Sequence, residues 1–280
     1  MSFSGDVKEE LSKINNLAHK DQVVAELCGY MDTVNTTMNK NEIKFSTESQ
    51  YNINRYSKLL KNIQINYDID IQGKVFSITF KPNDILIKKE IEKLSEMEKK
   101  SYIRGIFLGS GSLNNPNNTY HLEIILKNKK TAEKVLKLLE EFAINSKPLD
   151  RKKGYSIYMK DGEEISKLLA FMGANKAVIK FEEIRVVKET RNNINRIVNC
   201  ETANLNKTIN ASIEQINAIN KLIEKDELKK LSKGLQEIAM LRIENPEASL
   251  IELGKLLENP IGKSGVNHRL KKIVEIAMSQ

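Results

Sequence analysis

The sequence predicts an α+β fold in which two similar half-repeats, each carrying an antiparallel sheet, precede a small all-helical domain. The first observation is a repeat: the segment AELCGYMD at 25–32 returns about 76 positions later as SYIRGIFL at 101–108. The second is that similar elements follow each copy in the same order. The third is that strand patterns stop near Lys176, after which the chain reads as helix. Such a repeat indicates two related halves around a pseudo-twofold axis.

Each copy of the repeat places a small residue four positions before a glycine, Ala25 before Gly29 and Ser101 before Gly105. This spacing puts both small residues on one helix face, so two such helices can approach closely. A coincidental pair of core helices would show the same spacing. The length of the match and the shared order of elements favour duplication.

The elements of the larger domain follow from hydrophobic periodicity and turn residues. An amphipathic helix is expected near 6–14. The first half is expected to contain a helix capped near Asp21 and ending about Val34, a strand at 42–48, a helix at 53–63, and strands at 65–71 and 75–80 around a turn at Gly73. The second half is expected to contain a helix at 97–108, strands at 120–127 and 154–159, and helices at 131–142 and from Asp161.

Three helices are expected in the last 54 or so residues, after a connecting helix with a narrow apolar stripe. The first, at 228–243, stops before Pro246. The second begins at Ser249, which forms a capping-box pattern with Glu252, and ends near Leu257. The third is expected to be capped by Ser264 and to end near 278. Two short capped helices around a glycine-containing turn predict a helix-turn-helix.

The third of these helices has an apolar face and a polar, basic face. Its polar residues are the candidate DNA-binding residues: Lys263, Ser264, Asn267, His268, Arg269, Lys271 and Lys272. In a major groove, Asn267 could pair with adenine, and Arg269 could reach guanine or phosphate. The alternatives are a helical module with a solvated basic face and one that docks a protein.

The paired helices resemble the two LAGLIDADG helices of homing endonucleases, in the degenerate form found in the WhiA family of bacterial transcription regulators. The segments 1–4, 199–204 and 264–270 also resemble that family, so the likeness covers essentially the whole chain. It implies a LAGLIDADG-like domain with a sheet saddle at 1–200, with half-repeats at about 18–95 and 96–190. A connecting helix at 201–226 and a helix-turn-helix domain at 227–280 would follow.

In the endonucleases an acidic residue near the end of each helix shares divalent metal ions with its partner. The aligned positions here are Val34 and Ser110, which supply no carboxylate. Asp32 lies near the first position, but its counterpart is Leu108. Asp32 or Glu123 could replace the missing carboxylates as metal ligands only if they lay close together and were tightly positioned. We therefore expect no catalytic, metal or cofactor site and no enzyme activity, with an active endonuclease as the disfavoured alternative.

The formal charge of +8 and pI near 9.2 favour a polyanionic partner without establishing one. Cys28 and Cys200 are far apart, which argues against a disulfide framework or a structural zinc site. With no signal peptide or membrane-spanning stretch, we expect a cytoplasmic, nucleoid-associated protein. Because the duplication supplies its own symmetry, a monomer suffices.

The partners expected are double-stranded DNA and, from the resemblance alone, a sigma factor or RNA polymerase. The resemblance also implies a role in cell division or sporulation. A protein-interaction scaffold of the transcription machinery is the alternative function. For the first domain, DNA contact and protein docking are equally compatible with the sequence, and the candidate cations are Lys127, Lys129, Lys130, Lys134, Lys137, Arg151, Lys152 and Lys153.

Overall fold

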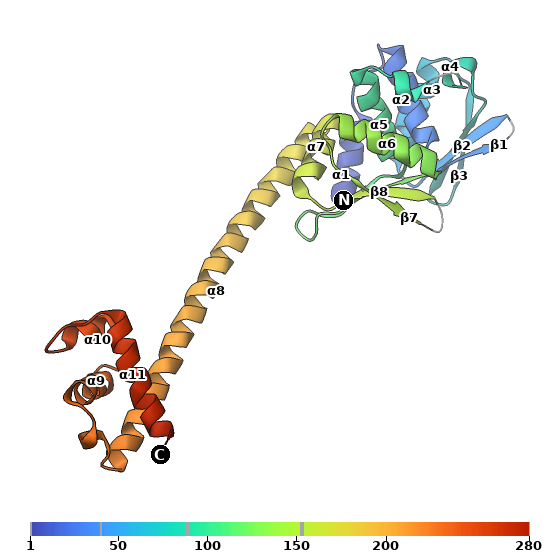
Figure 1. Ribbon diagram of the computed structural model, residues 1–280. Coiled ribbons are helices and arrows are strands. Elements are labelled where there is room, and N and C mark those ends of the chain that lie inside the picture. The colour runs from blue at the N-terminus through green and yellow to red at the C-terminus, as the bar shows by residue number, and fades with distance from the viewer. Residues whose placement is uncertain (1, 40, 88–89, 152–153, 280) are drawn as a thin grey trace. The chain divides into compact units, whose positions relative to one another are not determined.

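The computed structural model of the chain describes residues 2–39, 41–87, 90–151 and 154–279 (Figure 1). Contacts divide the chain into two compact units, Met1–Glu189 and Thr190–Gln280. Within the described ranges, no helix is both long and apolar enough to cross a membrane.

The first unit consists of two half-repeats with the same order of elements. The first half contains α2 (Lys20–Met31), β1 (Thr36–Asn39), β2 (Glu42–Thr47), α3 (Gln50–Asn62), β3 (Tyr67–Gln72) and β4 (Val75–Phe80). The second contains α5 (Glu96–Ser110), β5 (Ser112–Leu113), β6 (Leu122–Leu126), α6 (Lys129–Glu141), β7 (Lys147–Asp150) and β8 (Tyr155–Met159). Outside the repeats, this unit also contains α1 (Phe3–Ser12), α4 (Asp84–Ile87), the 3₁₀ turn Ile91–Lys93, α7 (Gly162–Met172) and the first turns of α8 (Asn175–Glu224).

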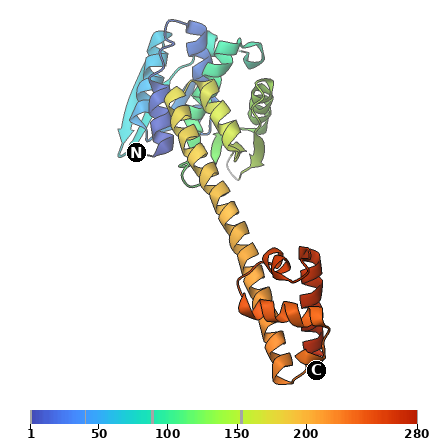
Figure 2. The ribbon, with the colours of Figure 1, turned by 90° about the vertical axis from the view of Figure 1, so that its left-hand side faces the viewer.

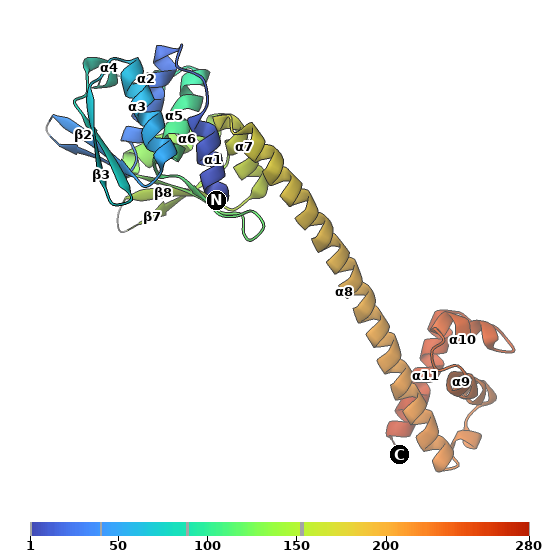
Figure 3. The ribbon, with the colours of Figure 1, turned by 180° about the vertical axis from the view of Figure 1, so that it is seen from behind.

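The two antiparallel sheets have matching strand orders, β1-β2-β4-β3 and β5-β6-β8-β7. Helices α2, α3 and α5 lie on one side of the strands (Figures 1 and 3). The halves also share a backbone detail, since Gln64 after α3 and Ala143 after α6 both have positive φ, 58° and 53°. The predicted α+β fold with a duplicated antiparallel unit is confirmed.

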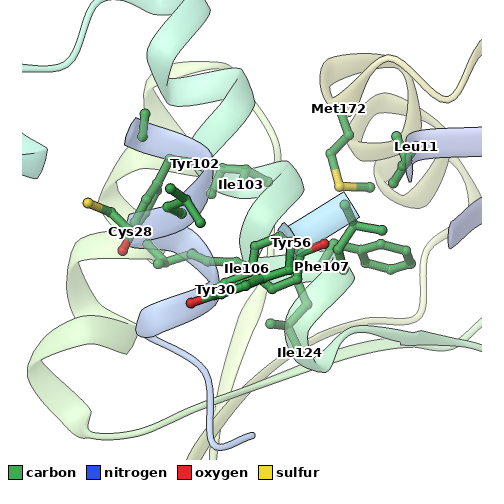
Figure 4. Packing of buried hydrophobic residues seen from close by; sticks show 14 of the residues in the cluster. Leu11, Cys28, Tyr30, Tyr56, Tyr102, Ile103, Ile106, Phe107, Ile124 and Met172 are labelled. Atoms are coloured by element: carbon green, nitrogen blue, oxygen red, sulfur yellow. The ribbon is translucent and has the colours of Figure 1, made fainter. Parts of the chain in front are cut away.

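Helices α2 and α5 meet backbone to backbone at the two repeated glycines. A Cβ atom on Gly29 would lie 2.1 Å from the carbonyl oxygen of Tyr102, and one on Gly105 would lie 2.0 Å from that of Glu26. Glycine is therefore required at both positions, as the spacing predicted. Beside the crossing, Tyr30 and Tyr56 pack edge to face with ring centroids 4.8 Å apart (Figure 4).

The sequence did not predict strands β1, β5 and β7, each of which is a short strand at the edge of its sheet. All four residues of β7, Pro148 among them, are exposed, so the alternation that reveals a half-buried strand is absent. The hairpin between β3 and β4 was predicted correctly, and Gly73 adopts φ 61° there. The cap expected at Asp21 is wrong: His19 precedes α2, and Asp21 lies in its first turn.

In the second unit, all the regular elements that the structure describes are helices. Helix α8 (Asn175–Glu224) begins in the residues of the first unit and continues into the second, so the helix expected at 201–226 is the end of a longer one. It is followed by the 3₁₀ turn Leu228–Lys230, α9 (Lys233–Glu244), α10 (Leu250–Leu256) and α11 (Lys263–Met278). In Figure 2, α11 runs beside the C-terminal part of α8.

The caps of this unit correct two expectations. The first helix was expected from residue 228, but α9 begins after Ser232, and a 3₁₀ turn precedes it. Ser249 and Glu252 form the predicted capping box, in which the Ser249 backbone N–H donates to the Glu252 carboxylate at 2.7 Å. The expected cap at Ser264 is wrong, because the extended residue Gly262 is the N-cap of α11, and Ser264 lies in the first turn.

Candidate nucleic-acid interface

Helix α11 presents one face to the core of its unit and another to solvent. Val266, Leu270, Ile273 and Ala277 are buried, following helical spacing, as the sequence predicted. Six of the seven candidate residues are exposed: Lys263, Ser264, Asn267, His268, Lys271 and Lys272. The structure therefore brings a cationic and hydrogen-bonding set together on the side of α11 away from its buried face.

A tight turn fixes how α11 leaves α10. A Cβ atom on Gly254 would lie 2.2 Å from the carbonyl oxygen of Ile261. The Ile261 backbone N–H donates to the Gly254 carbonyl at 3.1 Å. Because these atoms meet so closely, a larger residue at Gly254 would force the two helices apart. This contact sets the angle at which α11 presents its exposed face.

The connection between α9 and α10 is held by a buried arginine. Arg242 is 2% exposed, and its Nη1 donates to the Ala248 carbonyl at 2.7 Å. The Ser212 hydroxyl of α8 donates to the Pro246 carbonyl at 2.6 Å. Burial lowers the pKa of Arg242. This cation therefore stabilises the turn and does not belong to the exposed basic face.

The seventh candidate, Arg269, is less exposed than the other six and contacts a neighbouring helix. It is half-buried, and its Nη1 donates to the carbonyl of Gly234 in the first turn of α9 at 3.3 Å. The guanidinium also fills the space beside the Gly234 Cα. In this position Arg269 ties α11 to α9, and reaching a guanine would require it to leave that contact.

In the first unit, the positions aligned with endonuclease carboxylates contribute to packing. The Ser110 hydroxyl donates to the Ile125 carbonyl at 2.6 Å. Val34 lies against Gly154, where a Cβ would meet its Cγ1 at 2.9 Å. Both Val34 and Ser110 thus help seat strand β6 and the start of β8 against the ends of α2 and α5.

The neighbouring acids that might replace the lost carboxylates have protein partners. Asp32 accepts a hydrogen bond of 2.6 Å from the Tyr102 hydroxyl, and burial raises its pKa. Glu123, 8% exposed, binds the Arg151 guanidinium with two hydrogen bonds of 2.6 Å. In the described part of the chain, no three His, Cys, Asp or Glu side chains gather as metal ligands.

The candidate cations of the first unit do not form one free patch. Arg151 is paired with Glu123, and Lys134 lies 2.5 Å from the Glu92 carboxylate. Lys127 is partly buried, which lowers its pKa. Lys129, Lys130 and Lys137 are exposed, whereas Lys152 and Lys153 lie outside the described residues.

The sequence did not reveal a buried charge network at the helix crossing. Glu26 is fully buried and accepts hydrogen bonds from Arg55 at 2.8 and 2.9 Å. Arg104, on α5, donates to the same carboxylate at 3.1 Å. The available signal was Glu26 itself, an acid among the small and apolar residues that begin the first copy, where the second copy has Tyr102.

These features define a class: a degenerate LAGLIDADG-like domain followed by a helix-turn-helix domain. Comparison with known families agrees, since residues 99–191 match the WhiA LAGLIDADG-like domain and 194–277 match the WhiA C-terminal HTH domain. The "Probable cell division protein WhiA" of Clostridium tetani is 40% identical over 99% of this chain and 97% of its own length. The protein of the same name from Thermoanaerobacter pseudethanolicus is also 40% identical, with the same coverage. The chain belongs to the WhiA family.

Solved structures support both domains. Full-length DUF199/WhiA from Thermatoga maritima is 29% identical, with a TM-score of 0.68 over 100% of this chain and 99% of that one. The N-terminal LAGLIDADG domain of DUF199/WhiA is 26% identical, with a TM-score of 0.58 over 61% of this chain and 90% of that one.

Proposed function

We propose that this protein is a sequence-specific DNA-binding transcription regulator and that α11 is its recognition helix. The observation that carries the proposal is the exposed face of α11, where Lys263 and Lys271 flank Asn267 at four-residue spacing and Lys272 lies farther around the exposed side. A helix with cations beside a side chain that pairs bidentately with adenine is suited to the major groove. The membership in the WhiA family supports this reading.

The residues on this face have different roles in the proposal. Asn267 reads a base edge, while Lys271 and Lys272 neutralise phosphates without reading sequence. Ser264 and His268 add hydrogen-bonding capacity near the start of the helix, and Lys263 adds charge there. Arg269 holds α11 against α9 and presents the other side chains at a fixed angle, unless DNA draws it from Gly234.

Binding to a randomised duplex pool, followed by sequencing of the retained DNA, tests this assignment. Lys271→Ala should weaken binding to all sequences alike and reduce the salt slope by about one charge. Asn267→Ala should relax the preference at one base pair, a loss of roughly 1–3 kcal/mol of discrimination. Lys176→Ala, at an exposed lysine of the first unit, is the matched control. If neither α11 variant differs from this control, the groove assignment is wrong and a protein-docking scaffold is favoured.

We further propose that the LAGLIDADG-like domain has kept its architecture and lost cleavage. The pairing of Asp32 with Tyr102 and of Glu123 with Arg151 supports this proposal. The retained DNA should remain intact when magnesium is present. Magnesium-dependent cutting that Asp32→Ala abolishes would establish the endonuclease instead.

The names of the relatives support a role for this chain in cell division. We extend this to sporulation genes, to contact with a sigma factor or RNA polymerase, and to action as a monomer on the nucleoid in the cytoplasm. Deleting the gene in its host and measuring septum spacing, spore yield and transcription tests the physiological part. Unchanged division and sporulation would contradict it.

A further inference from the structure

The exposed part of α8 has an unusual composition. Every residue from 190 to 211 is exposed. Seven of them are asparagines and only one, Lys207, is a lysine, although the chain as a whole contains more lysine than asparagine. Asparagine favours helix less than lysine does, so a solvated helix would be expected to use lysine and glutamate. A genome whose codon usage enriches asparagine and lysine alike would not produce an excess of asparagine over lysine in this segment.

Five of these asparagines share a single helix face. Asn192, Asn195, Asn199, Asn206 and Asn210 follow steps of three, four, seven and four residues, which keep them in line. We call these five residues the asparagine face. Within the described parts of the chain, no hydrogen bond from these five side chains is seen. Their amides are therefore available to a ligand.

Within residues 190–211, the charged residues that border the asparagine face are all cations. The exposed Glu189, just before this stretch, is paired with Arg185. Arg191 borders one edge, and Arg196 and Lys207 border the other, by helical spacing. The acid of this stretch, Glu201, lies on the opposite side of the helix. The exposed Glu214 comes only after the face has ended. The surface offers amide donors between cations, which is the set that contacts nucleic-acid phosphates.

The asparagine face belongs to the same unit as the recognition helix. Lys221, farther along α8, donates from Nζ to the Ala277 carbonyl of α11 at 2.5 Å, so the two helices are tied together. The 22 exposed residues form a rod about 33 Å long, close to the ~34 Å of one duplex turn. The exposed rod could therefore follow phosphates of the DNA that α11 reads.

We propose that the asparagine face of α8 is a second DNA-backbone contact, flanking the site read by α11. This inference rests on the proposed DNA-binding function and extends it. The occupant is duplex DNA, held through its phosphates and without base specificity. The contact lengthens the footprint of a protein that has a single recognition helix in each chain.

The test compares two double variants that carry the same chemical change on different faces of α8. Asn199→Asp with Asn206→Asp places two carboxylates on the asparagine face. Asn193→Asp with Asn204→Asp places two carboxylates on the same exposed stretch, away from that face. Both pairs change net charge and helix propensity equally, so circular dichroism should show equal helix content.

Binding of the full chain to a random-sequence duplex of about 40 base pairs is then measured by fluorescence anisotropy over a salt series. We expect the first pair to weaken binding at least tenfold more than the second, and Arg196→Ala with Lys207→Ala to lower the salt slope by about one to two charges. Equal weakening by the two Asp pairs would overturn the proposed contact while leaving DNA binding intact. Failure of the unaltered chain to bind any duplex would overturn the proposed function itself.

Discussion

The paired helices α2 and α5 are buried on nearly every face, whereas α11 is buried on only one face. All residues from Val23 to Tyr30 and from Ser101 to Gly109 are buried. In α11 the buried set is a single stripe, Val266, Leu270, Ile273 and Ala277. The difference teaches that the duplicated pair forms a structural core, whereas α11 presents an exposed polar surface to solvent.

Charge follows the same division. At the helix crossing, Arg55 and Arg104 are buried and spend their hydrogen bonds on Glu26 and on backbone carbonyls. On α11, Lys271 and Lys272 are exposed and, among the residues that the structure describes, make no ion pair. The buried arginines of α3 and α5 are therefore engaged within the fold, whereas the lysines on α11 remain available to a polyanion.

The largest effect should come from the backbone contact at the centre of the pair. Gly105→Ala places a Cβ about 2.0 Å from the Glu26 carbonyl oxygen, so the helices must separate and lose packing along their whole length. We expect a loss of about 3–5 kcal/mol of unfolding free energy in the first unit. Chemical denaturation followed by circular dichroism measures it.

Gly262→Ala is the matched control, because nothing lies within 4 Å of a Cβ at that position. It should cost only about 0.5–1 kcal/mol, as a less favourable helix cap. If both variants cost the same, the close crossing of α2 and α5 is not what stabilises the first unit.

The next effect concerns the buried charge. Glu26→Gln keeps the side-chain shape but leaves Arg55 and Arg104 without a counterion in the core, which should cost about 3–5 kcal/mol. Glu92→Gln removes the partner of Lys134 at the surface and should cost far less, because solvent screens an exposed ion pair. Urea melts of both variants give the comparison. A Glu26→Gln melt that overlays wild type would mean that the interior charge is dispensable.

The sequence was sufficient where side chains leave a local pattern. The four-residue spacing to glycine within each repeat, the hairpin at Gly73 and the capping box at Ser249 each depend on residues near one another in the chain. So does the division of α11 into apolar and polar faces. The structure shows these features largely as the sequence predicted them.

The sequence did not predict features that depend on contacts between residues far apart in the chain. Arg269 reads as a groove residue until α9 is seen to place Gly234 beside it. Arg55 and Arg104 bind Glu26 from sequence separations of 29 and 78 residues, and no sequence motif indicates either pairing. The edge strands β1, β5 and β7 form because a neighbouring strand offers hydrogen bonds, which their own exposed residues do not reveal.

The smallest effect concerns Lys8 on α1, whose ammonium lies 5.9 Å from the centre of the Phe107 ring of α5. Burial lowers the pKa of Lys8 from 10.5 to about 8. Since the folded state binds this proton more weakly than the unfolded state does, the charge destabilises the fold below pH 8. That penalty fades as pH rises from about 8 to 10.5.

Lys8→Met should therefore raise the unfolding free energy at pH 7, by an amount on the order of 1 kcal/mol after solvent screening. The advantage over wild type should shrink between pH 8 and 10.5, as wild-type Lys8 becomes neutral in both states. Taking the difference between the two proteins in denaturant melts cancels the titration of all other groups. A constant advantage across this range would show that the gain comes from packing of the methionine and that Lys8 bears no buried charge.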